Sequence, residues 1–249
     1  NQAYGVRANV AYQDGGTAID NEKAKLGLVG LGLDYRQDNM RLSADLGYQN
    51  NELQKTRTNV TLSGLTRVPN AADAKSNWSQ PWSYSNEKDV FGTLRAEYDL
   101  SPNLTAYGAY GFRHGEEENS LANLTVTNLN GDGTTYRFDN AREDDINTGE
   151  IGIRGQLTSG KINHNWVVSG NIYKAQTKAP YQFDWQNTLT TNLYHPTSYA
   201  KPSWSAAALA GGDMNHPTKT GETTLTSVAL ADTLAFMDDK LQVTLGARH

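Results

Sequence analysis

Apolar and polar side chains alternate with a period of two along much of the chain. In residues 3–14, Tyr4, Val6 and Val10 fall on one face of an extended segment, while Arg7 falls on the other. This period is typical of β-strands with one apolar face. The alternation predicts nine strands, of which the second and the eighth are less regular: 3–14, 25–36, 40–49, 89–100, 104–113, 147–157, 164–175, 223–236 and 241–249.

The connectors between these strands are alternately long and short. Four are tight turns rich in Asp, Asn, Ser, Pro and Gly, whereas the others have 10, 39, 33 and 47 residues. A soluble β-sandwich does not explain this order, because compact domains rarely hold several such loops. We therefore expect an antiparallel transmembrane β-barrel with short periplasmic turns and long extracellular loops. The short connectors are 37–39, 101–103, 158–163 and 237–240; the long ones are 15–24, 50–88, 114–146 and 176–222.

The lengths of the strands and the places of the aromatic residues fit a bilayer. A tilted transmembrane strand needs roughly 9–11 residues, which matches the predicted runs. Aromatic residues gather near the ends of these runs, as in the interfacial girdle of a barrel. They are Tyr4, Tyr12, Tyr35, Tyr48, Tyr98, Phe112, Trp166 and Phe236.

The composition agrees with a barrel wall that faces a polar lumen on one side and lipid on the other. The chain has 249 residues, only 37% of them hydrophobic, and no stretch approaches the 18 apolar residues of a transmembrane helix. Its mean hydropathy is −0.66 although it contains 13 tyrosines and 5 tryptophans. The absence of cysteine excludes disulfides and thiol chemistry, and the net charge of −5 argues against nucleic acid as a partner.

The number of strands suggests that the barrel is larger than this sequence. Bacterial barrels made by one chain have an even number of strands, and an unpaired strand edge cannot lie in hydrocarbon. Nine strands leave both edges open. We therefore expect residues 1–249 to form one partial β-barrel domain.

Six segments together carry a resemblance to a known family. They are GVRANVAYQDG, LSADLGYQNNEL, QPWSYSNEKD, FGTLRAEYDLSPNLTAYGAYGFR, RFDNAREDDINTGEIGIRG and DTLAFMDDKLQVTLGARH. These segments resemble the TonB-dependent outer-membrane siderophore receptors, most closely those of the ferric-hydroxamate type. The resemblance covers nearly the whole chain, and its most specific parts are QPWSYSNEKD and NAREDD.

This resemblance implies a barrel of about 22 strands with an N-terminal plug domain that this sequence does not include. It implies uptake of a ferric siderophore across the bacterial outer membrane, energised by TonB, with the siderophore, the plug, TonB, lipid and lipopolysaccharide as partners. No cofactor and no covalent chemistry are implied. A passive porin is the alternative, because both need a polar lumen wall. The lumen-facing charges are Arg7, Arg41, Asp45, Arg95, Glu97, Asp99, Arg113, Glu150, Arg154 and Arg248.

Two groups of aromatic residues are candidates for the siderophore site, since aromatic rings offer rigid contact area with a polar tip. Trp78, Trp82 and Tyr84 end the connector 50–88, and by resemblance such a junction lines the pocket; the alternative is membrane anchoring or packing within the loop, which we favour for Trp78. The second group is Tyr181, Phe183 and Trp185, which alternate at the start of the connector 176–222. If they face inward they contact the ligand, and if outward they belong to the girdle or to a loop core.

Other candidate chemistry is weak. The five histidines lack metal-ligand spacing, and no nucleophile triad, phosphate loop or carboxylate pair indicates an enzyme. The acidic runs 116–118 and 143–145 could hold calcium or bridge lipopolysaccharide through cations, but a solvated loop face explains them more simply. Residues 124–138 contain Asn-Gly-Asp-Gly between two alternating runs, which predicts a β-hairpin rising from the barrel.

Overall fold

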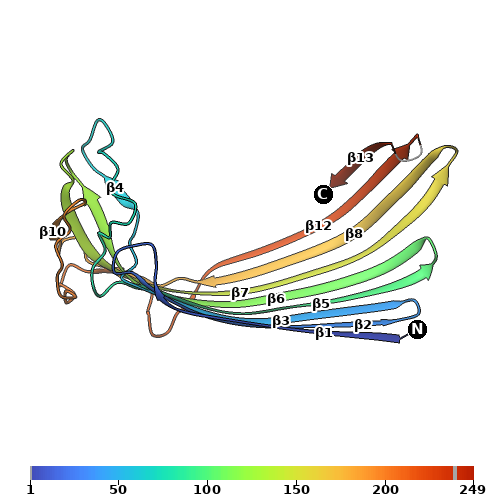
Figure 1. Cartoon of the computed structure of the whole chain (residues 1–249), viewed down its shortest axis with the longest axis horizontal. Coiled ribbons are helices and arrows are strands. Elements are labelled where there is room, and N and C mark those ends of the chain that lie inside the picture. Colours follow the sequence, from blue (N-terminus) through green and yellow to red (C-terminus); the bar gives the residue numbers. More distant parts are fainter. Residues whose placement is uncertain (1, 238–239) are drawn as a thin grey trace.

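The protein is described by a computed structural model that covers residues 2–237 and 240–249, and its regular structure is β (Figure 1). Nine long strands form an antiparallel meander in which neighbours in the chain are neighbours in the sheet. No helix among the described residues is long and apolar enough to cross a membrane. The long strands are β1 (Gln2–Gly16), β2 (Lys23–Gln37), β3 (Met40–Gln54), β5 (Tyr84–Ser101), β6 (Leu104–Val126), β7 (Asp132–Ser159), β8 (Ile162–Lys178), β12 (Lys219–Phe236) and β13 (Leu241–Arg248).

The nine strands predicted from the alternation are all present, and most extend further at the end that carries the long loops. Residues 238 and 239, in the fourth predicted turn, lie outside the described residues. Four short strands lie within the long connectors: β4 (Val60–Leu62), β9 (Tyr181–Phe183), β10 (Leu189–Asn192) and β11 (Leu209–Gly211). The long connectors gather at one end of the sheet and the short turns at the other (Figure 1). The prediction of an all-β, antiparallel barrel wall is confirmed.

The largest difference from the prediction concerns residues 114–146, which were expected to be a connector. They instead continue β6 and β7 as one hairpin in unbroken register, so that only residues 127–131 form its turn. The tip predicted over residues 124–138 is therefore the end of a much longer hairpin. Alternation fades in this stretch because strands that leave the membrane no longer need an apolar face.

Strand register divides the sheet into two faces. Val6 lies opposite Leu33, and the line continues through Ala44, Leu94 and Tyr110. This outer face carries exposed apolar residues, with Val6 74% exposed. The inner face, which begins with Arg7, carries the charged and polar residues. An apolar outer face and a polar inner face are what a barrel wall presents to lipid and to its lumen.

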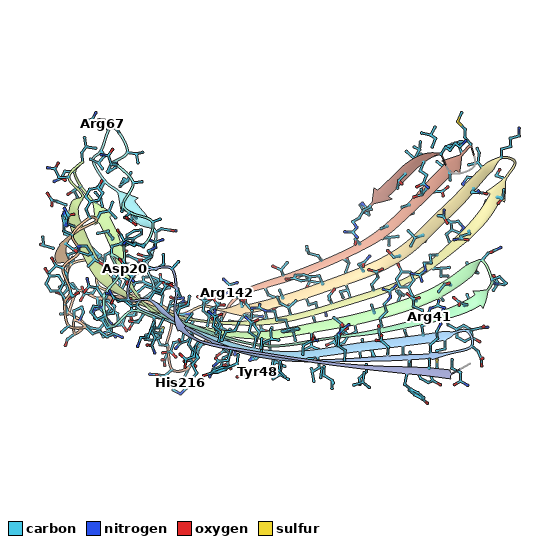
Figure 2. All side chains as sticks on the ribbon, in the orientation of Figure 1. Asp20, Arg41, Tyr48, Arg67, Arg142 and His216 are labelled. Atoms are coloured by element: carbon cyan, nitrogen blue, oxygen red, sulfur yellow. The ribbon has the colours of Figure 1, made fainter. Side chains whose placement is uncertain are left out.

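The buried apolar core lies in the looped end of the molecule, outside the barrel wall. We call this part the cap; it comprises the outer halves of β6 and β7, strands β4, β9, β10 and β11, and the loops between them. Leu124, Val126 and Leu193 form its buried cluster, and partly buried side chains pack around them. Figure 2 shows the cap, with Arg67 at its tip, rising on the side of the sheet where Arg142 lies, opposite Tyr48. The cap therefore rises at the end of the sheet on the side of the inner face.

The sheet is open among the described residues. β1 pairs with β2, β13 pairs with β12, and neither strand has a second neighbour. In hydrocarbon such free edges would leave backbone groups unsatisfied. The observed sheet therefore has the curvature and the faces of a barrel wall without closing into a barrel.

Candidate ligand site

Strand β9 continues β8 along the same neighbour and in the same register. Lys178 lies opposite Glu143 on β7, and Tyr181 lies opposite Asn140, which is the same offset. The ladder is interrupted at Pro180, because proline has no backbone N–H to donate; its carbonyl still accepts from the Ala141 N–H at 3.1 Å. The faces of β8 therefore carry over to β9, which places Tyr181 and Phe183 on the inner face.

Four aromatic rings meet on this inner face, and we call them the aromatic cluster: Tyr136, Phe138, Tyr181 and Phe183. The rings of Phe138 and Tyr181 are nearly parallel, with centroids 6.3 Å apart. Phe183 lies 6.2 Å from Tyr136, 6.1 Å from Phe138 and 6.0 Å from Tyr181. These separations are those of favourable aromatic pairs. Tyr181 remains exposed and the other three rings are partly exposed, so the cluster offers contact area at the mouth of the lumen.

Charged residues lie below the aromatic cluster on the same face of β6 and β7. The Arg142 Nε donates to Asp144 at 2.6 Å, and Arg113 pairs with Asp89 at 2.6 Å. Asp144 also accepts from the Thr177 hydroxyl. The inner wall thus passes from aromatic to ionic along β7 toward the barrel, with each guanidinium balanced by a carboxylate.

Trp82 and Tyr84 lie apart from the aromatic cluster. Tyr84 is in register with Ser120, which faces Asp139, and it shares the outer face of β5 with Val90. The ammonium of Lys201 lies 5.9 Å from the Trp82 ring centroid and 5.8 Å from that of Tyr84. Burial raises the pKa of the Tyr84 phenol well above its ordinary value, and its hydrogen bond to Glu118 raises it further. These contacts hold the cap together on the side away from the lumen.

Trp78 packs within the cap and Trp185 lies in a turn. The Trp78 ring contacts the buried cluster of the cap, its indole N–H donates to the Thr58 carbonyl at 2.9 Å, and the Arg57 guanidinium lies 4.7 Å from its centroid. Trp185 follows β9 after one residue and is 50% exposed. It was expected to continue the alternation of Tyr181 and Phe183, but the strand ends at Phe183.

The sequence did not single out Tyr136 and Phe138. Both lie on the inner face of β7, in the same alternation that places Arg154 there. The sequence does contain a signal, because Tyr136 and Phe138 are each an even number of residues from Arg154 and would share its face of a continuous strand. This spacing could be used only if β7 was known to run unbroken through the acidic residues before Ile146.

At the opposite end of the inner face, charged residues from several strands form one network. Glu97 accepts from Arg41 at 3.1 Å, pairs with Arg95 at 2.8 Å and accepts from Arg154 at 2.7 Å. Arg41 also donates twice to Asp99. The network ties β3, β5 and β7 together and leaves their guanidinium groups along the lumen.

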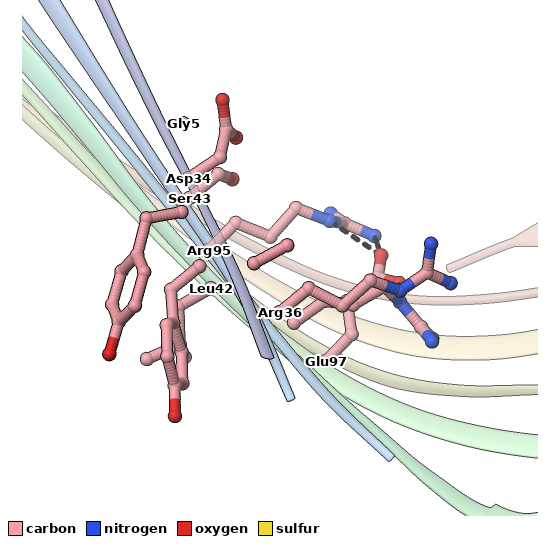
Figure 3. Close-up of a pocket in the computed structure, with 11 residues that line it drawn as sticks. Gly5, Asp34, Arg36, Leu42, Ser43, Arg95 and Glu97 are labelled. Carbon is pink, nitrogen blue, oxygen red and sulfur yellow. Dashed lines mark hydrogen bonds and ion pairs between the residues drawn. The ribbon is translucent and has the colours of Figure 1, made fainter. Parts of the chain in front are cut away.

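A hollow of about 420 Å³ adjoins this network near the free edge of β1 (Figure 3). Figure 3 shows Arg95 and Glu97 in its wall, while Tyr4 and Tyr35 line it from the outer face. Because it takes in side chains from both faces, the hollow follows the sheet edge and does not form an enclosed ligand pocket. The aromatic cluster in the cap is the better candidate for ligand binding.

These features together define a class: a segment of an outer-membrane β-barrel whose looped end carries a cluster of aromatic residues on the inner face. No family model matches the sequence. The chain is 35% identical over 246 residues to the ferrichrome receptor FcuA of Yersinia enterocolitica. This match covers 99% of this chain and 32% of that protein. The sequence is therefore similar to a siderophore receptor along nearly its whole length.

Solved structures agree with this comparison. BauA, the ferric preacinetobactin receptor of Acinetobacter baumannii, matches 98% of this chain and 36% of its own at a TM-score of 0.84 and 28% identity. The ferripyoverdine receptor of the outer membrane of Pseudomonas aeruginosa shows the same fold, with a TM-score of 0.68, 17% identity, and coverage of 98% of this chain and 32% of its own. The chain spans about a third of the length of these relatives. Its sequence and fold are similar to those of a segment of a siderophore-receptor barrel, which confirms the resemblance.

Proposed function

We propose that the protein takes up a ferric siderophore across the bacterial outer membrane and that the chelate binds at the aromatic cluster. The observation that carries this proposal is the placement of Tyr181 and Phe183. The register of β9 on β7, which has the same offset as the register of β8 on β7, puts them on the inner face beside Tyr136 and Phe138. Similarity to a protein named a ferrichrome receptor supports a hydroxamate chelate as the first ligand to test.

The chemistry of the cluster suits a bulky iron chelate with a polar rim. Aromatic rings provide large rigid contact surfaces at low entropic cost, and the phenol hydroxyls of Tyr136 and Tyr181 can exchange hydrogen bonds with chelate oxygens. Arg113 and Arg142, one step deeper and each paired with a carboxylate, add hydrogen-bond donors along the path inward. Binding of this kind needs no covalent step, and the iron remains inside its chelate.

The remaining partners follow from the same proposal. The charged network around Glu97 would contact a plug domain that fills the lumen, and TonB would act on that plug to open the path. Lipid and lipopolysaccharide would surround the outer face. The relatives named above are receptors, which favours a receptor over a passive porin. Among the candidate residues, we assign ligand contact to Tyr181 and Phe183, a contact at the rim to Trp185, and a supporting role to Trp78, Trp82 and Tyr84.

Replacement of Phe183 by alanine tests the proposal. In the intact receptor we expect F183A to weaken ferrichrome binding by about 1–3 kcal/mol, which is typical of a buried aromatic anchor. Quenching of tryptophan fluorescence by ferrichrome measures the affinity. Tyr48→Ala is the matched control, because it also removes an aromatic ring, but one that is exposed on the outer face. Equal affinities of F183A and the wild type would contradict ligand contact at the cluster, and a wild type that binds no hydroxamate or catecholate chelate would contradict the function.

A further inference from the structure

β9, the strand that carries Tyr181 and Phe183, is too short to be stable through its own backbone pairing. β9 has three residues, pairs with β7 on one side and with β11 on the other, and is preceded by Pro180. Backbone pairing over three residues stabilises such a strand only weakly, since sheet stability comes from neighbouring side chains and burial. The position of Tyr181 and Phe183 must therefore depend on the residues around β9.

Directly after β9, Asp184 closes a long loop by accepting hydrogen bonds. It is 1% exposed, and its carboxylate accepts from the Ser205 N–H at 2.7 Å, from the Ser205 hydroxyl at 2.8 Å and from the Asn187 N–H at 3.3 Å. Burial alone would raise the pKa of Asp184, but these hydrogen bonds hold it below its ordinary value. The backbone N–H of Asp184 donates to the Arg137 carbonyl at 3.2 Å. Ser205 is thus fixed to the residue that follows Phe183.

The segment that leads back to Ser205, which we call the strap (residues 197–205), is the part of the cap that lies against the outer face of β7. Gln80 is fully buried; its side-chain N–H donates to the Thr197 carbonyl at 2.8 Å, and its carbonyl oxygen accepts from the Tyr199 N–H at 2.8 Å. The Gln80 amide therefore pairs with the backbone of the strap in the way that a neighbouring strand would. It joins the strap to the loop before β5, more than a hundred residues away in sequence.

Further contacts hold the strap along the same face. The Arg137 guanidinium donates to the Pro202 carbonyl at 2.9 Å and lies 3.8 Å from the Trp204 ring centroid. Lys201 lies over the rings of Trp82 and Tyr84 and 3.7 Å from Asp139. The strap therefore lies on the outer face of the hairpin strand whose inner face carries Tyr136 and Phe138.

We propose that Gln80 and Asp184 are positioning residues that hold β9 through the strap, so that Tyr181 and Phe183 are fixed on the inner face before a ligand arrives. Neither residue lies in the aromatic cluster. Their effect on binding rests on the proposed function, because it operates by lowering the ordering cost of the ligand site. Their effect on β9 does not require any ligand.

The test combines hydrogen exchange with ligand affinity in the intact receptor. Gln80→Met keeps the size of the side chain but removes both hydrogen bonds to the strap. We expect amide exchange to rise at residues 181–183 and 197–205 without ligand, and the Kd for ferrichrome to rise about tenfold, because an unfixed strand must be ordered on binding. Gln80→Glu retains the acceptor for Tyr199 and is expected to lie between the wild type and Gln80→Met.

Asn77→Ala is the matched control in the same loop. Asn77 is also a buried amide, and it donates to the Asp20 and Lys55 carbonyls without touching the strap. We expect faster exchange near Lys55 in this variant but unchanged exchange at residues 181–183 and unchanged ferrichrome affinity. Ser205→Ala, which removes one hydrogen bond to Asp184, should reproduce the effect of Gln80→Met in weaker form.

The outcomes separate this proposal from the proposed function. Unchanged exchange at residues 181–183 in Gln80→Met would overturn the role of the strap. Faster exchange with unchanged ferrichrome affinity would overturn positioning of the ligand site. If the wild type fails to bind ferrichrome, the proposed function fails at this ligand, and the exchange data still decide whether the strap holds β9.

Discussion

Glycines allow close approaches between neighbouring strands in this protein, and Gly133 is the tightest case. It lies at the start of β7, buried opposite Val126 at the tip of the long hairpin. A Cβ atom there would lie 2.0 Å from the Thr125 carbonyl oxygen. The obstacle is backbone and cannot rotate away, unlike the ring of Phe91 that a Cβ at Gly47 would meet. Glycine at this position is thus required by the close approach of β6.

Gly133→Ala should therefore loosen the tip of the hairpin. We expect a loss of about 1–3 kcal/mol in the local stability of the cap, the usual cost of forcing extra atoms into a packed site. Hydrogen exchange at residues 123–135 measures this loss. Gly27→Ala is the control, because a Cβ there meets nothing within 4 Å. The steric explanation is wrong if both variants exchange at the same rate.

At the scale of strands, the sequence predicted the parts of the strands that cross the membrane but not the parts that extend beyond it. The nine strands were found because a wall between lipid and water must alternate. Their extensions, such as residues 114–123 of β6, were missed because acidic residues there have no apolar face to reveal the period. The same limit affected the site: the even spacing from Val90 to Tyr84 fixes the outer face only once β5 is known to begin at Tyr84. The direction of Tyr181 and Phe183 needed the register across Pro180, which no local pattern contains.

Neighbouring strands of the wall are also joined by charge, and Glu97 is the centre of that contact. It receives three guanidinium groups, from Arg41, Arg95 and Arg154, and is mostly shielded from solvent. Glu97→Gln would leave these cations without their shared anion. We expect barrel stability to fall by about 1–2 kcal/mol, less than for a fully buried pair because the arginines are partly exposed.

Urea unfolding of the refolded receptor in detergent micelles measures this loss. Asp45→Asn is the control, because both side chains of the Asp45–Arg7 ion pair are exposed and the pair should contribute little to stability. If Glu97→Gln unfolds at the same urea concentration as the control, the network does not join the strands energetically. A loss that disappears at high salt would show that the arginines are screened by solvent more than the structure indicates.

At the scale of the whole molecule, the barrel wall and the cap are held by different forces. The wall has long ladders and an exposed apolar face, so its stability depends on the surrounding lipid. The cap has its own buried cluster of Leu124, Val126 and Leu193 and is fastened by side-chain hydrogen bonds such as those of Gln80. One chain thus combines a wall that depends on lipid with a cap that has a buried cluster of its own.

Two adjacent residues in the middle of β5 test the assignment of faces that underlies this division. Leu94 is 54% exposed on the outer face, opposite Ala44 and Tyr110, whereas Thr93 lies on the inner face opposite Asp45. Leu94→Arg would place a charge in lipid near the bilayer centre, at a cost of about 2–4 kcal/mol. Thr93→Arg would place the same charge in the polar lumen beside a carboxylate, where it should cost little. Refolding into phospholipid vesicles, followed by urea titration, compares the two variants. A larger loss in Thr93→Arg than in Leu94→Arg would reverse the faces, and with them the inward direction of Tyr181 and Phe183.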